Sequence, residues 1–300
     1  MVGGYKTAGS MRLANRNNPF DEREARSGLR SPKSRYIIFA EGAETEKLYF
    51  TSLSRSKRKK ENIMIEYMDR WKDNSGRSNQ LSVVKDVIEY VENVKNGKIN
   101  VNSLKNLFDQ LVENLKIEEL PAITDQLNRL AKNNPDLFAP NESMQAQLFS
   151  CLTVKEFDSE YDKIFIILDR DRHSFTKEQF DEVLVKSKSN NLNLGITNPC
   201  FEFFLLLHFK EIISVLDHDN LEKLKNNPKS GKKTYVEQLL SNYLFQYTNR
   251  SFKKNNYDTN FFIERIDVAL ANAKQFEINN EKLEDELGSS IINILKEIID

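Results

Sequence analysis

The sequence of 300 residues is long enough for one large domain or two small ones. Charged residues make up 30% and hydrophobic residues 39%, with a formal net charge of −1, as is ordinary for a soluble protein. No stretch approaches the roughly 18 apolar residues of a membrane span, and no signal-peptide core is evident. The two cysteines and three histidines lack the number or spacing of a disulfide framework or a zinc site. We therefore expect a reduced, cytoplasmic compartment and no membrane partner.

Positive charge is distributed unevenly along the chain. Residues 1–34 combine many Lys and Arg residues with Gly, Ser and Asn and contain few large apolar side chains. This composition predicts a basic, disordered tail. A later basic cluster contains Lys232 and Lys233. Basic patches suit nucleic-acid phosphates, but a charge run is more often a solvated face. Both interpretations of Lys232 and Lys233, nucleic-acid contact and surface loop, stay open.

From residue 35 onward, apolar runs alternate with helical periodicity. The pattern predicts a strand at 36–40, a helix at 45–58, a strand at 63–67 and a helix at 81–94. Residues 97–158 interrupt this alternation with several amphipathic stretches separated by prolines. We expect this segment to be a helical insertion into an α/β core that serves as a partner surface or as a cap over the substrate.

The alternation then resumes. The predicted elements are a strand at 164–168, a helix at 176–189, a strand at 192–197 and a helix at 200–213. Asn198 is expected to cap the last helix, with Pro199 at its first position. This helix is apolar nearly all round, which predicts that it is buried. The β/α alternation predicts a mostly parallel sheet with helices on both faces.

Two acidic motifs follow predicted strands. Glu41-Gly42 follows the first strand, and Asp169-Arg170-Asp171 follows the strand at 164–168. Ligands bind outside the carboxyl ends of parallel strands, so the two motifs are expected to meet in one crevice. Crowded carboxylates repel each other unless a cation joins them, and oxygen ligands favour Mg²⁺. Either motif alone could be a helix-preceding turn or a solvent loop, but together they predict a site.

Glu202 and His208 lie on the apolar helix and each allows two interpretations. A carboxylate in the first turn of a helix is stabilised by the helix dipole, which is reason enough for Glu202. Alternatively, a third strand end delivers Glu202 into the same crevice as the other acids, because a buried carboxylate needs partners. We expect His208 to be a satisfied core histidine.

Three segments resemble the motifs of the RloB-like family. Residues 36–50 (YIIFAEGAETEKLYF) are similar to its opening strand and EGxxTExxYF motif, and residues 165–171 (FIILDRD) resemble its apolar strand followed by DxD. Residues 198–209 (NPCFEFFLLLHF) closely resemble its NPCFExWLLLHF segment, with two Phe residues where Leu and Trp are more usual. Residues 269–274 and 287–290 are similar to its terminal helix and the following turn. The resemblance covers about residues 35–300.

The resemblance implies a Toprim-type core, an α/β, Rossmann-like fold, and Mg²⁺-dependent chemistry at phosphodiesters, with Mn²⁺ as an alternative ion. It places Glu41, Asp169 and Asp171 at the family's acidic positions. It also implies a component of bacterial anti-phage abortive infection, encoded beside an ABC-type or AAA-type ATPase. The chain has no GxxxxGK[ST] phosphate loop of its own, as expected if the ATPase is a separate partner.

The expected activity is that of a metal-dependent nuclease. Asp169 and Asp171 hold one or two Mg²⁺ ions with help from Glu41 or Glu202, and Glu41 is either the general base or a metal ligand. Glu46 is expected to be a helix-start acid without a role, and the alternative is that it supports Glu41 from behind the metal ligands. A non-catalytic Toprim-like module that binds nucleic acid or an ATPase is the alternative, and a DxD phosphatase is a weaker one. DNA, tRNA and other RNA stay open as substrates, as does a homo-oligomer.

Overall fold

The computed structural model describes residues 34–42, 44–68, 79–96, 153–154, 156–172, 174–215 and 217–299. The basic tail predicted for residues 1–34 and most of the helical insertion predicted for 97–158 lie outside this part of the chain. Within it, no helix is both long and apolar enough to cross a membrane.

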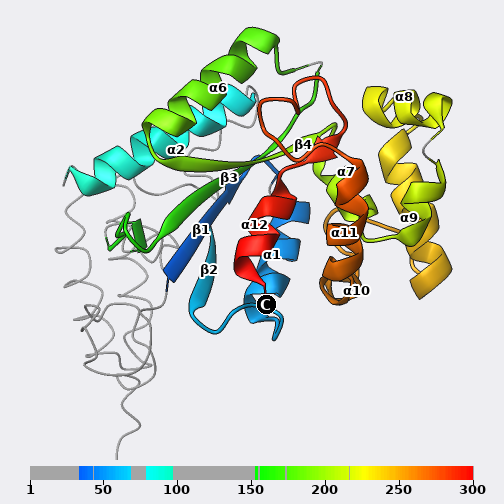
Figure 1. Cartoon of the computed structure of the whole chain (residues 1–300), viewed down its shortest axis with the longest axis horizontal. Coiled ribbons are helices and arrows are strands. Elements are labelled where there is room, and N and C mark those ends of the chain that lie inside the picture. The colour runs from blue at the N-terminus through cyan, green and yellow to red at the C-terminus, as the bar shows by residue number, and fades with distance from the viewer. Residues whose placement is uncertain are drawn as a thin grey trace, which may run out of the picture.

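A five-stranded sheet forms the centre of the molecule (Figure 1). Its order is β2-β1-β3-β4-β7, in which the strands up to β4 run parallel and β7 is antiparallel to β4. The strands are β1 (Ser34–Ala40), β2 (Ile63–Met68), β3 (Lys163–Asp169), β4 (Leu192–Asn198) and β7 (Gly288–Ser289). The α/β class and the four strands expected from the sequence are confirmed, and the arrangement is consistent with a Toprim-like fold. A separate hairpin joins β5 (Lys229–Ser230) to β6 (Lys233–Thr234).

Helices cover both faces of the sheet. They are α1 (Thr45–Arg55), α2 (Gln80–Lys95), α6 (Lys177–Ser189), α7 (Phe201–Leu206), α8 (His218–Asn226), α9 (Tyr235–Thr248), α10 (Thr259–Glu264), α11 (Ile266–Asn272) and α12 (Ile291–Ile298). Short 3-10 helices span Lys210–Val215 and Ala273–Gln275. The predicted helices at 45–58, 81–94 and 176–189 are confirmed, although the first ends three residues earlier than expected.

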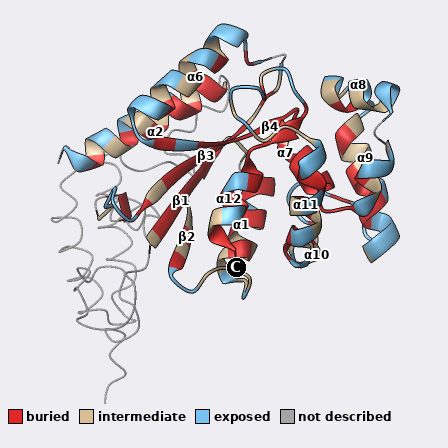
Figure 2. Ribbon diagram, in the orientation of Figure 1, coloured by how far each residue is buried: buried red, intermediate tan, exposed pale blue. Residues whose placement is uncertain are grey.

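The two faces have separate hydrophobic cores. Helices α2 and α6 pack together over one of them, which we call the α2/α6 face. Helices α1, α7 and α12 cover the other, with α9 to α11 beyond them, and we call this the α1/α7 face. Figure 2 shows buried residues along the strands and on the inward sides of the helices. Successive β1 residues alternate between the cores, since Ile37 belongs to one and Ile38 to the other.

The helix predicted at 200–213 is shorter than expected. The predicted cap is wrong, because Asn198 is the last residue of β4, the N-cap position of α7 is Cys200 and Pro199 precedes the helix. The Asn198 side-chain nitrogen instead donates to the carbonyls of Leu283 and Glu286 at 2.9 and 3.0 Å. At the other end, the Asn272 side chain donates to the carbonyls of Leu207 and Phe209 at 2.9 and 2.8 Å. These carbonyls are therefore bonded to a side chain distant in sequence, and α7 ends at Leu206.

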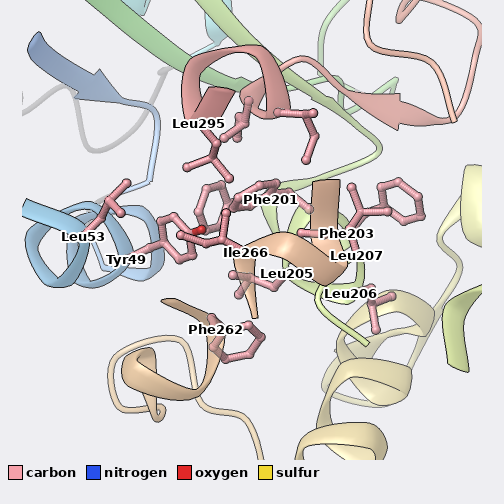
Figure 3. Packing of buried hydrophobic residues seen from close by; sticks show 14 of the residues in the cluster. Tyr49, Leu53, Phe201, Phe203, Leu205, Leu206, Leu207, Phe262, Ile266 and Leu295 are labelled. Atoms are coloured by element: carbon pink, nitrogen blue, oxygen red, sulfur yellow. The ribbon is translucent and has the colours of Figure 1, made fainter. Parts of the chain in front are cut away.

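The burial expected for this helix is confirmed. Every residue of α7 is buried, and Figure 3 shows Phe201 of α7 beside Tyr49 of α1, with Phe203 and Leu206 on the side away from α1. His208 is fully buried as well, with Nδ1 beside two backbone carbonyls at 3.2 Å and Nε2 at 3.2 Å from the Tyr49 hydroxyl. Because Nδ1 must donate to those carbonyls, Nε2 accepts from Tyr49. Burial lowers the pKa of His208 to about 3, so His208 is a neutral core residue, as predicted.

Candidate functional site: an acidic cluster at the strand ends

The central strands β1 and β3 are parallel neighbours whose following helices lie on opposite faces of the sheet. Helix α1 follows β1 onto the α1/α7 face, and α6 follows β3 onto the α2/α6 face (Figure 1). Connections that leave in opposite directions open a crevice at the carboxyl ends of the strands, the usual ligand position in open α/β sheets. Glu41 directly follows β1 and Asp169 is the last residue of β3, so both stand at this point.

Glu41 is held on both carboxylate oxygens. Its Oε2 accepts from the backbone N–H of Asp169 at 3.3 Å, and its Oε1 accepts from the side-chain amide of Gln80 at 3.2 Å. The backbone N–H of Glu41 donates to the carbonyl of Ile167 at 3.0 Å, which continues the β1–β3 ladder by one residue. The convergence of the two acidic motifs expected from the sequence is therefore present.

Asp169 links β3 to α7. Its Oδ1 accepts from the backbone N–H of Phe201 at 2.8 Å, so this carboxylate caps the first residue of the helix. Burial raises the pKa of Asp169 well above its usual range, and the nearby Glu41, Glu46 and Glu202 raise it further. The next residue of α7 is Glu202, which reaches the same place because Asp169 fixes the start of its helix. This geometry agrees with the second interpretation of Glu202, in which its carboxylate enters the same crevice as the other acids.

Glu46 belongs to the cluster, although we expected it to be a helix-start acid without a role. It lies in the first turn of α1 and is buried. Burial raises its pKa to about 7, and Glu202 and Glu41 contribute in the same direction. Its carboxylate lies against Gly42, where a Cβ atom would overlap it. The pairing of Gly42 with an acid four residues later is the signal that could have indicated Glu46. Glu41, Glu46, Asp169 and Glu202 are called the acidic cluster below.

Lys254 brings positive charge to the cluster. Its Nζ lies 3.1 Å from Glu202 and 2.8 Å from Glu237, which is in the first turn of α9. Burial alone would lower the pKa of Lys254, but the two carboxylates outweigh it and the pKa is raised. The Thr45 hydroxyl donates to the Lys254 carbonyl at 3.4 Å, so the loop after α9 is also attached to the start of α1. Nothing in the sequence pairs Lys254 with Glu202, because the contact is purely tertiary.

Arg170 and Asp171 turn away from the centre of the cluster. Arg170 is buried on the α2/α6 face, donates to the Phe175 carbonyl at 2.6 Å and lies over the Phe180 ring. The Asp171 carboxylate accepts from the Ser174 hydroxyl at 3.0 Å. Asp171 is not among the groups that most raise the pKa of Asp169. Asp171 is therefore adjacent to the cluster, and its carboxylate is engaged within the β3–α6 turn.

Lys232 and Lys233 occupy the β5–β6 hairpin that precedes α9. Lys232 is exposed, whereas the Lys233 ammonium donates to Ser241 of α9 at 3.1 Å. Neither lysine forms a described ion pair with the acidic cluster. Glu237, three residues after the hairpin, does contact Lys254, so the hairpin is joined to the cluster through one turn of α9.

The donor set of the cluster suits a divalent metal ion. Burial and neighbouring carboxylates raise the pKa of Glu46 and of Asp169, and Glu202 lies beside Lys254. Hard oxygen donors of this kind are the ligands that Mg²⁺ takes. In the described part of the chain, however, no three His, Cys, Asp or Glu side chains are arranged to hold one ion. Asp169 and Glu41 instead accept backbone and amide N–H groups. The chemistry of the residues fits the ion, because a carboxylate oxygen that accepts one N–H group keeps a second lone pair for a cation, and the side chains would have to draw closer together to hold it.

Fold and cluster together define an α/β protein with an acidic site at the switch between its two faces. The sequence matches the RloB-like protein family over residues 36–298, and the chain belongs to this family. Searches of curated proteins and of solved structures found no match.

Proposed function

We propose that this protein is a metal-dependent, Toprim-type nuclease that hydrolyses phosphodiester bonds of DNA or RNA, tRNA included. The observation that supports this most is the direct contact of Glu41 with Asp169 at the ends of adjacent parallel strands. Membership of the RloB-like family supports the wider role, cytoplasmic anti-phage abortive infection with an ABC-type or AAA-type ATPase as partner.

In this proposal Glu41 and Asp169 would hold Mg²⁺, or Mn²⁺ in its place, and Asp171 would join them from the β3–α6 turn. A divalent ion bound there would supply positive charge for the scissile phosphate and would lower the pKa of water. Glu41 would either accept the proton of the attacking water or ligate the ion. Glu202, which contacts Lys254, would add a further carboxylate to the site. Lys232 and Lys233 contact the phosphate backbone beside the cluster.

Glu46 and Lys254 adjust the net charge of the acidic cluster in this proposal. A carboxylate whose pKa is about 7 can hold a proton while the site is empty and release it when a cation arrives. Lys254 keeps the charge of Glu202 balanced from the protein side and fixes the loop that borders the site.

The test is cleavage of plasmid DNA and total tRNA by the purified chain with Mg²⁺ or Mn²⁺, with and without the partner ATPase. The variants Glu41→Gln and Asp169→Asn keep the side-chain shape and remove one charge each. We expect metal-dependent cleavage that falls by ~10³-fold or more in both, because several kcal/mol of charge stabilisation is lost. Glu160→Gln, an exposed acid before β3, is the matched control and should cleave like the wild type.

Three outcomes would contradict the proposal. Cleavage that survives both substitutions would place the chemistry elsewhere. No cleavage of either nucleic acid, even with the ATPase, would favour a non-catalytic module that binds nucleic acid or the ATPase. Release of phosphate from small esters without cleavage would instead favour a phosphatase.

A further inference from the structure

Gln80 is a buried polar residue that the sequence did not single out. It is the first residue of α2, preceded by the N-cap Asn79, whose side chain accepts from the backbone N–H of Ser82. The first turn of a surface helix normally points its polar side chains to water. Gln80 is fully buried instead, at 0% exposure. Its side chain reaches from the α2/α6 face to the end of β1.

The amide of Gln80 completes the environment of the Glu41 carboxylate. Its Nε2 donates to Glu41 Oε1 at 3.2 Å, while the backbone N–H of Asp169 donates to Oε2 at 3.3 Å. A carboxylate can only accept hydrogen bonds, so the nitrogen end of the amide must face it. The Gln80 oxygen consequently points elsewhere, and within the described residues it has no hydrogen-bond donor.

A purely structural role would not favour this arrangement. A buried carbonyl oxygen without a partner costs free energy of folding. An apolar side chain of the same length would avoid that cost, but it would leave Glu41 Oε1 without the amide donor. The arrangement is therefore explained by the hydrogen bond that Gln80 donates to Glu41, which comes with some loss of free energy of folding.

We infer that Gln80 is the positioning residue for Glu41, an inference that rests on the nuclease function proposed above. A neutral amide fixes the orientation of the carboxylate and leaves its full negative charge available to a divalent ion or to water. A Lys or Arg at this position would compete with the ion for Glu41, and a Glu would repel it. Partners of this kind behind metal ligands change metal affinity or activity by about 10–100-fold when removed.

The experiment compares Gln80→Met and Gln80→Glu with the wild-type full-length chain. Both replacements keep the length of the side chain, and both lose the N–H donor. The matched control is Gln179→Glu, a Gln in the first turn of α6 on the same face, where Glu preserves the capping box. Three quantities are measured for each chain: thermal stability in chelator, Mn²⁺ affinity without substrate, and nucleic-acid cleavage.

We expect Gln80→Met to keep or raise the melting temperature while its Mn²⁺ affinity and cleavage fall about 10–100-fold. Gln80→Glu should lose more cleavage than Gln80→Met, because it adds a like charge beside Glu41. Gln179→Glu should match the wild type in all three measurements.

The results also separate this inference from the proposed function. Wild-type Mn²⁺ affinity and cleavage in Gln80→Met would overturn the role of Gln80 and leave the nuclease standing. A loss that appears only together with a lower melting temperature would likewise overturn it, in favour of a structural role. A wild-type chain that neither binds Mn²⁺ nor cleaves would overturn the nuclease and this role together.

Discussion

Helices α1 and α7 on one face of the sheet and helix α2 on the other all reach the same strand ends, but they bring different groups there. The α1/α7 face supplies two buried carboxylates, Glu46 and Glu202. The α2/α6 face supplies the neutral amide of Gln80. Glu41 and Asp169 stand between them on the strands. The buried carboxylates of Glu46 and Glu202 and the side-chain amide that binds Glu41 thus come from opposite sides.

This difference follows from how each face is built. On the α1/α7 face, aromatic rings such as Tyr49 pack against α7 (Figure 3), and every residue of this helix, Glu202 included, is buried. The α2/α6 face is a more aliphatic layer over the sheet, and it contributes one side chain at the start of α2. Loss of packing in either core should therefore lower the free energy of unfolding, whereas loss of packing around α7 should also displace the Glu202 carboxylate.

The largest expected effect distinguishes the two cores directly. Leu205→Ala on α7 and Ile164→Ala at the start of β3 remove buried aliphatic side chains from opposite faces. Each should lower the free energy of unfolding by about 2–5 kcal/mol, measured by denaturant titration. Only Leu205→Ala should also weaken Mn²⁺ binding, because it loosens the helix that holds Glu202. Equal metal affinity in the two folded variants would refute the difference between the faces.

A smaller effect concerns the charge of the α1/α7 face. Because burial raises the pKa of Glu46 from 4.5 to about 7, the folded protein binds a proton there that the unfolded chain releases above pH 4.5. In chelator, the contribution of Glu46 to the free energy of unfolding should therefore fall as the pH rises from 4.5 to 7 and then level off.

Glu46→Gln should remove this part of the pH dependence and stabilise the protein at pH 8 by at most about 3 kcal/mol. Chemical denaturation at pH 5 and pH 8 measures it. Glu44→Gln, an exposed neighbour, is the control and should change neither value. Unchanged stability of Glu46→Gln at pH 8 would mean that the ionised Glu46 carboxylate does not destabilise the fold.

The smallest expected effect is that of Lys254, which links Glu202 to Glu237. Its side chain is 55% exposed, so solvent screens both ion pairs. Lys254→Met should lower the melting temperature by about 2–4 °C at low salt and less in 1 M NaCl. Lys253→Met, at the exposed neighbouring position, should have no effect. A salt-independent loss, or the same loss at Lys253, would exclude an electrostatic role for Lys254.

The sheet could be predicted from the sequence because its strands are short, β-rich apolar runs between helical patterns. Glu41 and Asp169 could be placed together by the rule that parallel strands present their carboxyl ends on one edge. That expectation needed no knowledge of side-chain contacts, and the 3.3 Å contact between them agrees with it.

The rest depends on contacts between residues distant in sequence. The Asn272 side chain donates to the carbonyl of Leu207, 65 residues away in sequence, just beyond the end of α7. Local periodicity therefore overestimated the length of this helix. Gln80 and Lys254 are ordinary polar residues until the fold brings them to Glu41 and Glu202. Glu46 looked like a common helix-start acid, and only its burial beneath Gly42 distinguishes it.

The most direct test of the central claim is a double-mutant cycle on metal binding. Mn²⁺ affinity is measured calorimetrically for the wild type, Glu41→Gln, Asp169→Asn and the double variant. If the two acids form one site, each single substitution should lose nearly as much binding free energy as the double, because residues that share a partner are not additive. Additive losses, or wild-type affinity in either single variant, would show that Glu41 and Asp169 do not hold one ion and would contradict the account.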